Sequence, residues 1–161
     1  MITDSLLAEA EAVIAACRAK GVTLATAESC TGGLIAATLT AIPGSSDVLE
    51  RGFVTYSNES KNEMIDVPIS LIQAHGAISE EVARAMAEGA LRRSRATIAV
   101  SVTGIAGPGG GAEAKPVGLV CFGLAEKAGI AISEHRILPG DRTGVRAAAV
   151  ARAFALIRAR V

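Results

Sequence analysis

Apolar residues recur every three to four positions in several segments of the chain, which predicts helices with one buried face. Over residues 6–20 the stripe ends at Gly21, a residue type that favours the left-handed turn closing a helix. The clearest helix follows Ser79, because Glu80 and Glu81 in its first turn complement the helix dipole. That helix is expected over about 80–95. Further helices are predicted over residues 34–42, stopped by Pro43 and Gly44, over 58–66 with Asn58 as cap, and from Asp141, its cap, to the end.

Short apolar runs predict five strands, over residues 22–27, 52–56, 97–103, 117–125 and 130–138. Residues 97–103 are nearly all apolar or β-branched, which is typical of a central strand buried on both faces. The last two strands are joined by a turn over 126–129 and are expected to be antiparallel. Because strands first alternate with helices and a hairpin follows, we expect one α/β domain over residues 1–161. It would be a three-layer α/β/α domain with a mixed, mostly parallel sheet and a C-terminal hairpin.

Composition narrows the function classes. Half of the 161 residues are apolar, which is typical of a globular chain, and 16 basic residues balance 16 acidic ones. Without a basic excess, and with only one Tyr, three Phe and no Trp, the chain is not expected to bind nucleic acid. No basic segment precedes an apolar run at the start, and apolar runs are too short to span a membrane, so we expect a cytoplasmic protein.

Metal and disulfide chemistry are also not expected. Cys17, Cys30 and Cys121 are odd in number and far apart, which indicates reduced thiols. His75 and His135 lie sixty residues apart, and no HExxH motif is present. We therefore expect no metal and no cofactor.

A polar turn over residues 26–33 is the first segment that could carry chemistry. A strand would run into this turn and a helix would follow, which places Ser29 beside helix N-terminal amides that could stabilise an oxyanion. The alternative is that Ser29 or Thr31 only caps the helix. Two familiar serine motifs are absent, since Ala27 replaces the first Gly of G-x-S-x-G and Gly32 replaces the Lys of S-x-x-K.

A serine nucleophile needs a base, and the chain has few candidates. The four lysines are Lys20, Lys61, Lys115 and Lys127. Lys61 follows an apolar strand, where burial could lower its pKa toward neutrality; the alternative is a solvated lysine on a short helix. Cys30, beside Ser29, is the rival nucleophile. The glycine-rich segment 104–111 matches neither a Walker A loop nor a dinucleotide fingerprint, and predicts a mobile loop over a pocket or an ordinary surface loop.

Five motifs together resemble the C-terminal domain of the competence/damage-inducible protein CinA, in its stand-alone form, over roughly residues 5–160. They are Thr26-Ala-Glu-Ser-Cys-Thr-Gly-Gly33, Gly44-Ser-Ser46, Gly52-Phe-Val-Thr-Tyr-Ser-Asn58 with Lys61, Gly76-Ala-Ile-Ser-Glu-Glu81, and Thr103-Gly-Ile-Ala-Gly-Pro-Gly-Gly-Gly111 with Lys115-Pro-Val-Gly118. The chain departs from the family pattern at Ser60, where Ala is usual, and at Asp66, where Gly is common.

The resemblance implies hydrolysis of nicotinamide mononucleotide to nicotinate mononucleotide and ammonia in pyridine nucleotide salvage, by a serine amidohydrolase with a Ser/Lys pair. Ser29 would be the nucleophile, Lys61 the base, and Tyr56 a third catalytic residue. Substrate-binding positions would be Gly44, Ser46, Thr103, Gly104 and Arg142, with Arg142 as the first choice for the phosphate and Lys115 as the second. A non-catalytic nucleotide-binding or partner module with the same pocket is the alternative function. The composition also permits a homodimer.

Overall fold

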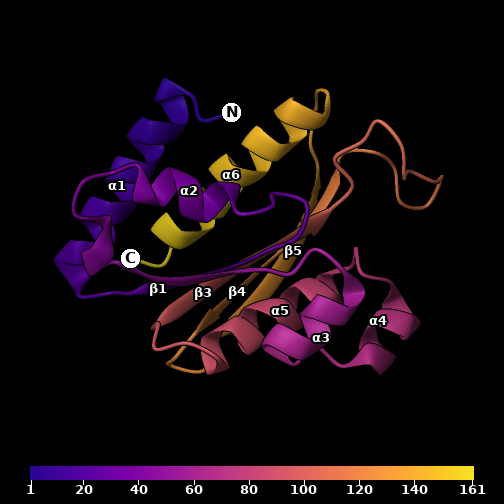
Figure 1. The fold of residues 1–161 in the computed structure, drawn as a ribbon, viewed down its shortest axis with the longest axis horizontal. Helices are drawn as coiled ribbons and strands as arrows, with labels where there is room; N and C mark the ends of the chain where they lie inside the picture. Colours follow the sequence, from indigo (N-terminus) through magenta and orange to yellow (C-terminus); the bar gives the residue numbers. More distant parts are fainter.

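The computed structural model describes residues 1–161 and contains one five-stranded sheet, in the order β2-β1-β3-β4-β5 (Figure 1). The strands are β1 (Leu24–Glu28), β2 (Leu49–Val54), β3 (Ile98–Gly104), β4 (Leu119–Glu126) and β5 (Ala131–Ile137). β1 pairs in parallel with β2 and β3, whereas β3–β4 and β4–β5 are antiparallel. Four of the five strands therefore run in the same direction, which confirms the predicted mixed, mostly parallel sheet with a C-terminal hairpin.

Helices cover both faces of this sheet (Figure 1). They are α1 (Asp4–Lys20), α2 (Leu34–Thr40), α3 (Asn58–Ile65), α4 (Ile69–His75), α5 (Glu80–Arg92) and α6 (Arg142–Arg158), with a short 3-10 helix, η1 (Ser45–Asp47). α1, α2 and α6 lie on one face, and α3, α4 and α5 on the other. The first face packs over a cluster of 24 buried apolar residues and the second over a cluster of 10. None of these helices has the length and apolarity needed to cross a membrane.

Local sequence signals locate most elements correctly. All five residues of β1 and the first six of β3 are buried, as expected for central strands. Ser79 and Asp141 cap α5 and α6, because their side chains accept hydrogen bonds from the N–H groups of Val82 and Gly144. The predicted bounds differ by a few residues, since β1 begins at Leu24 and not at residue 22, and β2 covers 49–54 and not 52–56.

In the region after β2, one expectation is wrong and one helix was not predicted. Ser57, not Asn58, caps α3, because the Ser57 hydroxyl accepts from the N–H of Ser60. α4 was not expected: it is seven residues long and buries only Ile72, so it has no apolar stripe to reveal it. At the end of α3, Asp66 adopts a left-handed conformation (φ 59°), which explains why this departure from a common glycine is conformationally demanding.

Candidate active site

The turn after β1 places Ser29 at the carboxyl end of the sheet. β1 ends at Glu28, the N–H of Gly32 closes a turn by donating to the Ser29 carbonyl (3.0 Å), and α2 begins at Leu34. Gly32 and Gly33 both have positive φ (59° and 99°), so a side chain at either position would be strained. The two glycines therefore serve the tight return of the chain from strand to helix.

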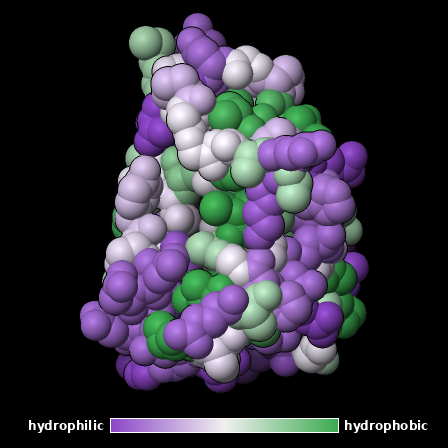
Figure 2. All heavy atoms as spheres, turned by 90° about the vertical axis from the view of Figure 1, so that its right-hand side faces the viewer, coloured by the Kyte–Doolittle hydropathy of each residue, from purple (hydrophilic) through white to green (hydrophobic).

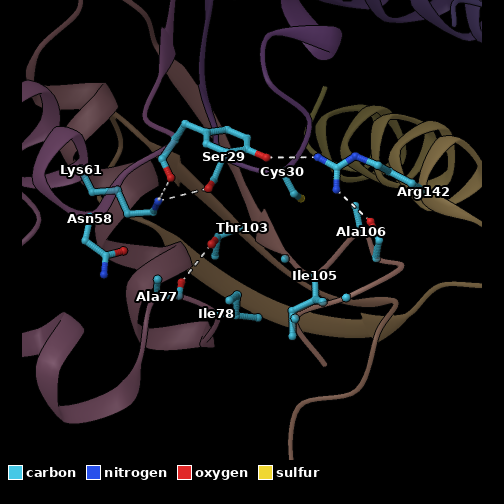
Figure 3. Close-up of a pocket in the computed structure, with 15 residues that line it drawn as sticks. Ser29, Cys30, Asn58, Lys61, Ala77, Ile78, Thr103, Ile105, Ala106 and Arg142 are labelled. Atoms are coloured by element: carbon cyan, nitrogen blue, oxygen red, sulfur yellow. Dashed lines mark hydrogen bonds between the residues drawn. The ribbon is translucent and has the colours of Figure 1, made fainter. Parts of the chain in front are cut away.

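Lys61 is buried beside this turn and faces Ser29 (Figure 3). Its Nζ lies 3.1 Å from Ser29 Oγ and donates to the carbonyl oxygens of Thr55 (2.8 Å) and Tyr56 (3.3 Å). Only 1% of Lys61 is exposed, and this burial lowers its pKa from 10.5 to about 8. The interpretation of Lys61 as a solvated lysine is therefore wrong, and a nucleophile and a base lie within hydrogen-bond distance of each other.

Cys30 also lines the site, but its thiol is poorly suited to attack. Burial raises the pKa of Cys30 to about 12, so the thiol is protonated at neutral pH. Since the thiolate is the reactive form of cysteine, Cys30 is the weaker candidate next to Ser29.

The expected role of the α2 N-terminus is wrong. Its free amides are already occupied, because the buried Glu28 carboxylate accepts from the N–H groups of Gly33 (3.1 Å), Ile35 (3.0 Å) and Ala36 (2.9 Å). The N–H groups of Cys30 and Thr31, in the turn itself, donate to no oxygen of the protein. Of these two residues, Cys30 lines the cavity and Thr31 is fully buried.

A cavity of about 320 Å³ opens in front of Ser29. Figure 2 shows this end of the molecule, where hydrophobic atoms lie in a hollow between hydrophilic ones. Ile78 and Ile105 supply apolar wall, and Thr103 lies between them and Ser29, with its hydroxyl donating to the Ala77 carbonyl (2.9 Å) (Figure 3). No carboxylate lines the cavity. The lining therefore combines apolar side chains with polar, uncharged or basic ones.

The loop between β3 and β4 forms another wall, as expected for a glycine-rich loop over a pocket. Ala106 and Gly107 of this loop line the cavity, together with Gly104, the last residue of β3. Arg142, at the start of α6, donates to the Gly107 carbonyl (2.9 Å) and to the Tyr56 hydroxyl (3.2 Å). Arg142 does not pair with its neighbour Asp141, whose carboxylate caps α6.

The structure brings Ser29, Tyr56, Lys61, Thr103, Gly104 and Arg142 to one cavity. It does not bring Gly44 and Ser46 there. They precede β2, whose start pairs with the start of β1, so they lie at the opposite end of the sheet. The Gly44 carbonyl accepts from Arg18 (2.8 Å). Lys115 is also elsewhere, since its Nζ donates to the His75 carbonyl (2.7 Å) at a neighbouring cavity.

Several residues of the site were not recognised from the sequence. Asn58 was interpreted as a helix cap but lines the cavity, as do Ile78 and Ile105. Glu28 carried one signal: it is an acidic residue at the end of the otherwise uncharged strand β1, a few residues before a helix N-terminus, where a carboxylate is favourable. No three His, Cys, Asp or Glu side chains are arranged to hold a metal ion.

Comparisons with known proteins identify a family and a fold that this chain shares. The family model for the CinA C-terminal domain matches residues 7–161. The nicotinamide-nucleotide amidohydrolase PncC of Escherichia coli K12 is 52% identical over 154 residues, which are 95% of this chain and 93% of that protein. A crystal structure of the competence/damage inducible protein CihA from Agrobacterium tumefaciens has a TM-score of 0.95 and 44% identity, covering 99% of this chain and 97% of that one.

Other relatives are longer than this chain. A protein from Symbiobacterium thermophilum, named for competence and damage induction, is 55% identical over 148 residues, which are 86% of this chain and 34% of that protein. A similarly named relative from Caldicellulosiruptor bescii is 47% identical over 151 residues, 94% of this chain and 36% of its own length. The chain thus spans about a third of these two relatives.

Proposed function

Because the chain belongs to the CinA C-terminal domain family, we propose that it hydrolyses the carboxamide of nicotinamide mononucleotide to nicotinate mononucleotide and ammonia, a reaction of pyridine nucleotide salvage. The name of the Escherichia coli relative supports this substrate, and that relative is matched over nearly its whole length. The observation that carries the proposal is the 3.1 Å contact between Ser29 Oγ and the buried Lys61 Nζ at the cavity wall.

We propose a two-step serine mechanism. Neutral Lys61 takes the Ser29 proton while Ser29 Oγ attacks the carboxamide carbon, and the resulting ammonium returns that proton to the nitrogen as the C–N bond breaks. Ammonia leaves, and the nicotinoyl group remains as an ester on Ser29. Lys61 then deprotonates a water molecule, whose oxygen attacks the ester carbon. The bond from this carbon to Ser29 Oγ breaks, Lys61 returns its proton to Ser29 Oγ, and the acid product leaves as a carboxylate after losing its proton to solvent. No metal takes part in this proposal.

The lowered pKa of Lys61 makes the amine usable as a base. At a pKa of about 8, roughly a tenth of the molecules carry neutral Lys61 at pH 7, whereas an ordinary lysine would be almost wholly protonated. The carbonyls of Thr55 and Tyr56 hold the amine in place through both protonation states. The rate should therefore rise with pH up to about 8.

The negative charge on the carboxamide oxygen also needs donors. The N–H groups of Cys30 and Thr31 support this role, because they follow the nucleophile directly and donate to no oxygen of the protein. In the same proposal Ile78 and Ile105 contact the pyridine ring, and Thr103 orients the carboxamide. Arg142, at the rim, would bind the phosphate.

The test is ammonia release from nicotinamide mononucleotide with EDTA present, for the wild type and for Ser29→Ala, Lys61→Ala and Cys30→Ala. We expect Ser29→Ala and Lys61→Ala to lose at least about a thousandfold in kcat, the scale seen when members of a serine catalytic unit are removed. Cys30→Ala should keep most of its activity. Full activity in Ser29→Ala or Lys61→Ala, or loss in Cys30→Ala alone, would overturn the mechanism. Calorimetric binding of the nucleotide by the wild type without any ammonia would instead indicate a binding module.

A further inference from the structure

Two charged side chains hold the Ser29 turn without lining the cavity: Glu28 from β1 and Arg146 from α6. Building on the proposed role of Ser29, we infer that Glu28 and Arg146 are positioning residues. Together they fix the Ser29–Thr31 turn so that the serine hydroxyl faces Lys61 and the two following amides stay free for the oxyanion.

Glu28 controls both partners of the Ser29–Lys61 pair. Through its side chain it ties the start of α2 to the end of β1 with three N–H bonds, so the intervening turn has fixed ends. Through its main-chain carbonyl it accepts from the N–H of Thr55 (2.8 Å), and the Thr55 carbonyl in turn accepts from Lys61 Nζ. A shift of Glu28 would therefore move the nucleophile and the acceptor that orients the base.

Arg146 controls the direction of the turn's peptide groups. Its Nε donates to the Cys30 carbonyl (3.2 Å) and its Nη2 to the Thr31 carbonyl (3.0 Å), so both oxygens point toward α6. In a trans peptide the N–H points opposite to the C=O. The N–H of Thr31, which shares a peptide group with the Cys30 carbonyl, is therefore turned away from α6.

The two anchors differ from ordinary caps and surface ion pairs. Glu28 is fully buried and has no ion-pair partner, and Arg146 is half-buried and bonds to carbonyls, not to a carboxylate. Burying a charged group costs free energy because the group loses its hydration. The rate of reaction can offset this cost, since a misplacement of about 1 Å in a reacting group can lower the rate about a hundredfold. Their effect should thus appear in the chemical step.

The experiment compares Glu28→Gln, Arg146→Lys and Arg146→Met with the wild type in three measurements. These are kcat and KM for nicotinamide mononucleotide, the second-order rate of covalent labelling of Ser29 by a fluorophosphonate, and the thermal midpoint. Glu28→Gln keeps the size of the side chain but turns an amide donor toward the α2 amides. We expect a loss of about 10- to 100-fold in kcat for Glu28→Gln and Arg146→Met, with KM within about threefold and a parallel loss of labelling. Arg146→Lys should lose less kcat and less labelling than Arg146→Met.

Matched controls separate positioning from stability. Thr3→Ala removes a helix cap far from the site, and Arg152→Met removes another α6 arginine that pairs with Glu134. Both should lower the thermal midpoint and leave kcat and labelling within about twofold.

The outcomes are distinguishable. If Ser29→Ala keeps full activity, the proposed mechanism fails. If Ser29→Ala is inactive while Glu28→Gln and Arg146→Met lower only the thermal midpoint, the positioning inference alone is overturned. Should Glu28→Gln not fold, the two Arg146 variants decide, because a loss of kcat in Arg146→Met without recovery in Arg146→Lys also contradicts the inference.

Discussion

At the residue scale, Arg142 joins three parts of the site through one guanidinium. It bonds to the glycine-rich loop through Gly107 and to the strand-to-helix connection through Tyr56, and it lies in the first turn of α6. A guanidinium has five N–H donors, and two are used by these contacts. The others, together with the positive end of the helix, are available to a phosphate at the cavity rim.

Arg142→Ala should therefore discriminate between substrates. We expect it to lower kcat/KM for nicotinamide mononucleotide about tenfold to a hundredfold, which corresponds to about 1.5–3 kcal/mol for a charge-assisted hydrogen bond. Activity on nicotinamide riboside, which lacks the phosphate, should change little. Steady-state kinetics on both substrates check this, and equal losses on the two would show that Arg142 shapes the loop and does not bind phosphate.

Sequence reasoning reached these residues unevenly. The polar turn indicated Ser29 directly. Lys61 was a candidate because it follows an apolar strand, and the resemblance pointed to it and to Arg142. The sequence left open whether Lys61 is buried or solvated, because its burial depends on a contact with the Ser29 turn, more than thirty residues away. The same is true of Glu28: an acidic residue in a strand is recognisable, but which three amides it binds follows only from the path of the turn.

At the element scale, the site depends on how closely α3 approaches α5. Lys61 lies on α3, and the carbonyl of Ile65 at the end of this helix lies directly against Gly89 of α5, so that a methyl group at position 89 would overlap that oxygen. Helix propensity alone favours alanine over glycine by up to about 1 kcal/mol. Packing at position 89 favours glycine, since forcing a methyl group into a filled contact costs about 1–3 kcal/mol.

Gly89→Ala should thus lower the free energy of unfolding by up to about 2 kcal/mol, the overpacking cost reduced by the gain in helix propensity. Urea unfolding followed by circular dichroism measures this. Gly144→Ala, in α6, is the matched control, because a methyl group at position 144 would meet no atom closer than 3.4 Å. It should be neutral or stabilising. A stabilising Gly89→Ala would mean that α3 moves away from α5 without cost.

The fold was predictable at the level of elements whose pattern is local. The apolar run of β3 and the caps of α5 and α6 were recognisable because each depends on neighbours in the sequence. α4 was not, since seven residues with one buried side chain give no period to read. The order of strands in the sheet depends on pairing between segments far apart in the sequence. The contact between the Ser29 turn and α3 follows from that order, so it was not predictable from local patterns.

At the scale of the whole molecule, the site takes residues from both sides of a sheet that separates two apolar clusters of unequal size. The larger cluster lies under α1, α2 and α6, and the smaller one under α3, α4 and α5. Ser29 follows the central strand β1, and Lys61 comes from the helix layer with the smaller core. Burying an amine there opposes folding, because the folded protein disfavours its charged form.

This opposition gives the stability of the protein a defined pH dependence. The pKa of Lys61 is about 8 in the folded protein and near 10.5 in an unfolded chain, so between these values the unfolded state binds more protons. The contribution of Lys61 to the free energy of unfolding therefore rises as pH increases from 8 to 10.5. Below pH 8 the whole cost of burying the charged amine lowers the free energy of unfolding. Lys61→Met has no such group. Relative to Lys61→Met, the wild type should gain on the order of 1–3 kcal/mol between pH 7 and 10.5.

Urea unfolding of both proteins across this range measures the difference, in which all other titrating groups cancel. Lys127→Met, at an exposed lysine, is the control and should show no trend relative to the wild type. A flat difference for Lys61→Met would mean that the amine titrates as if it were in water, and it would then be a poor base at neutral pH. The same burial that weakens the fold below pH 8 is what makes Lys61 able to take the Ser29 proton. The rate should therefore reach half of its plateau near pH 8, the same pH at which the stability difference begins to rise.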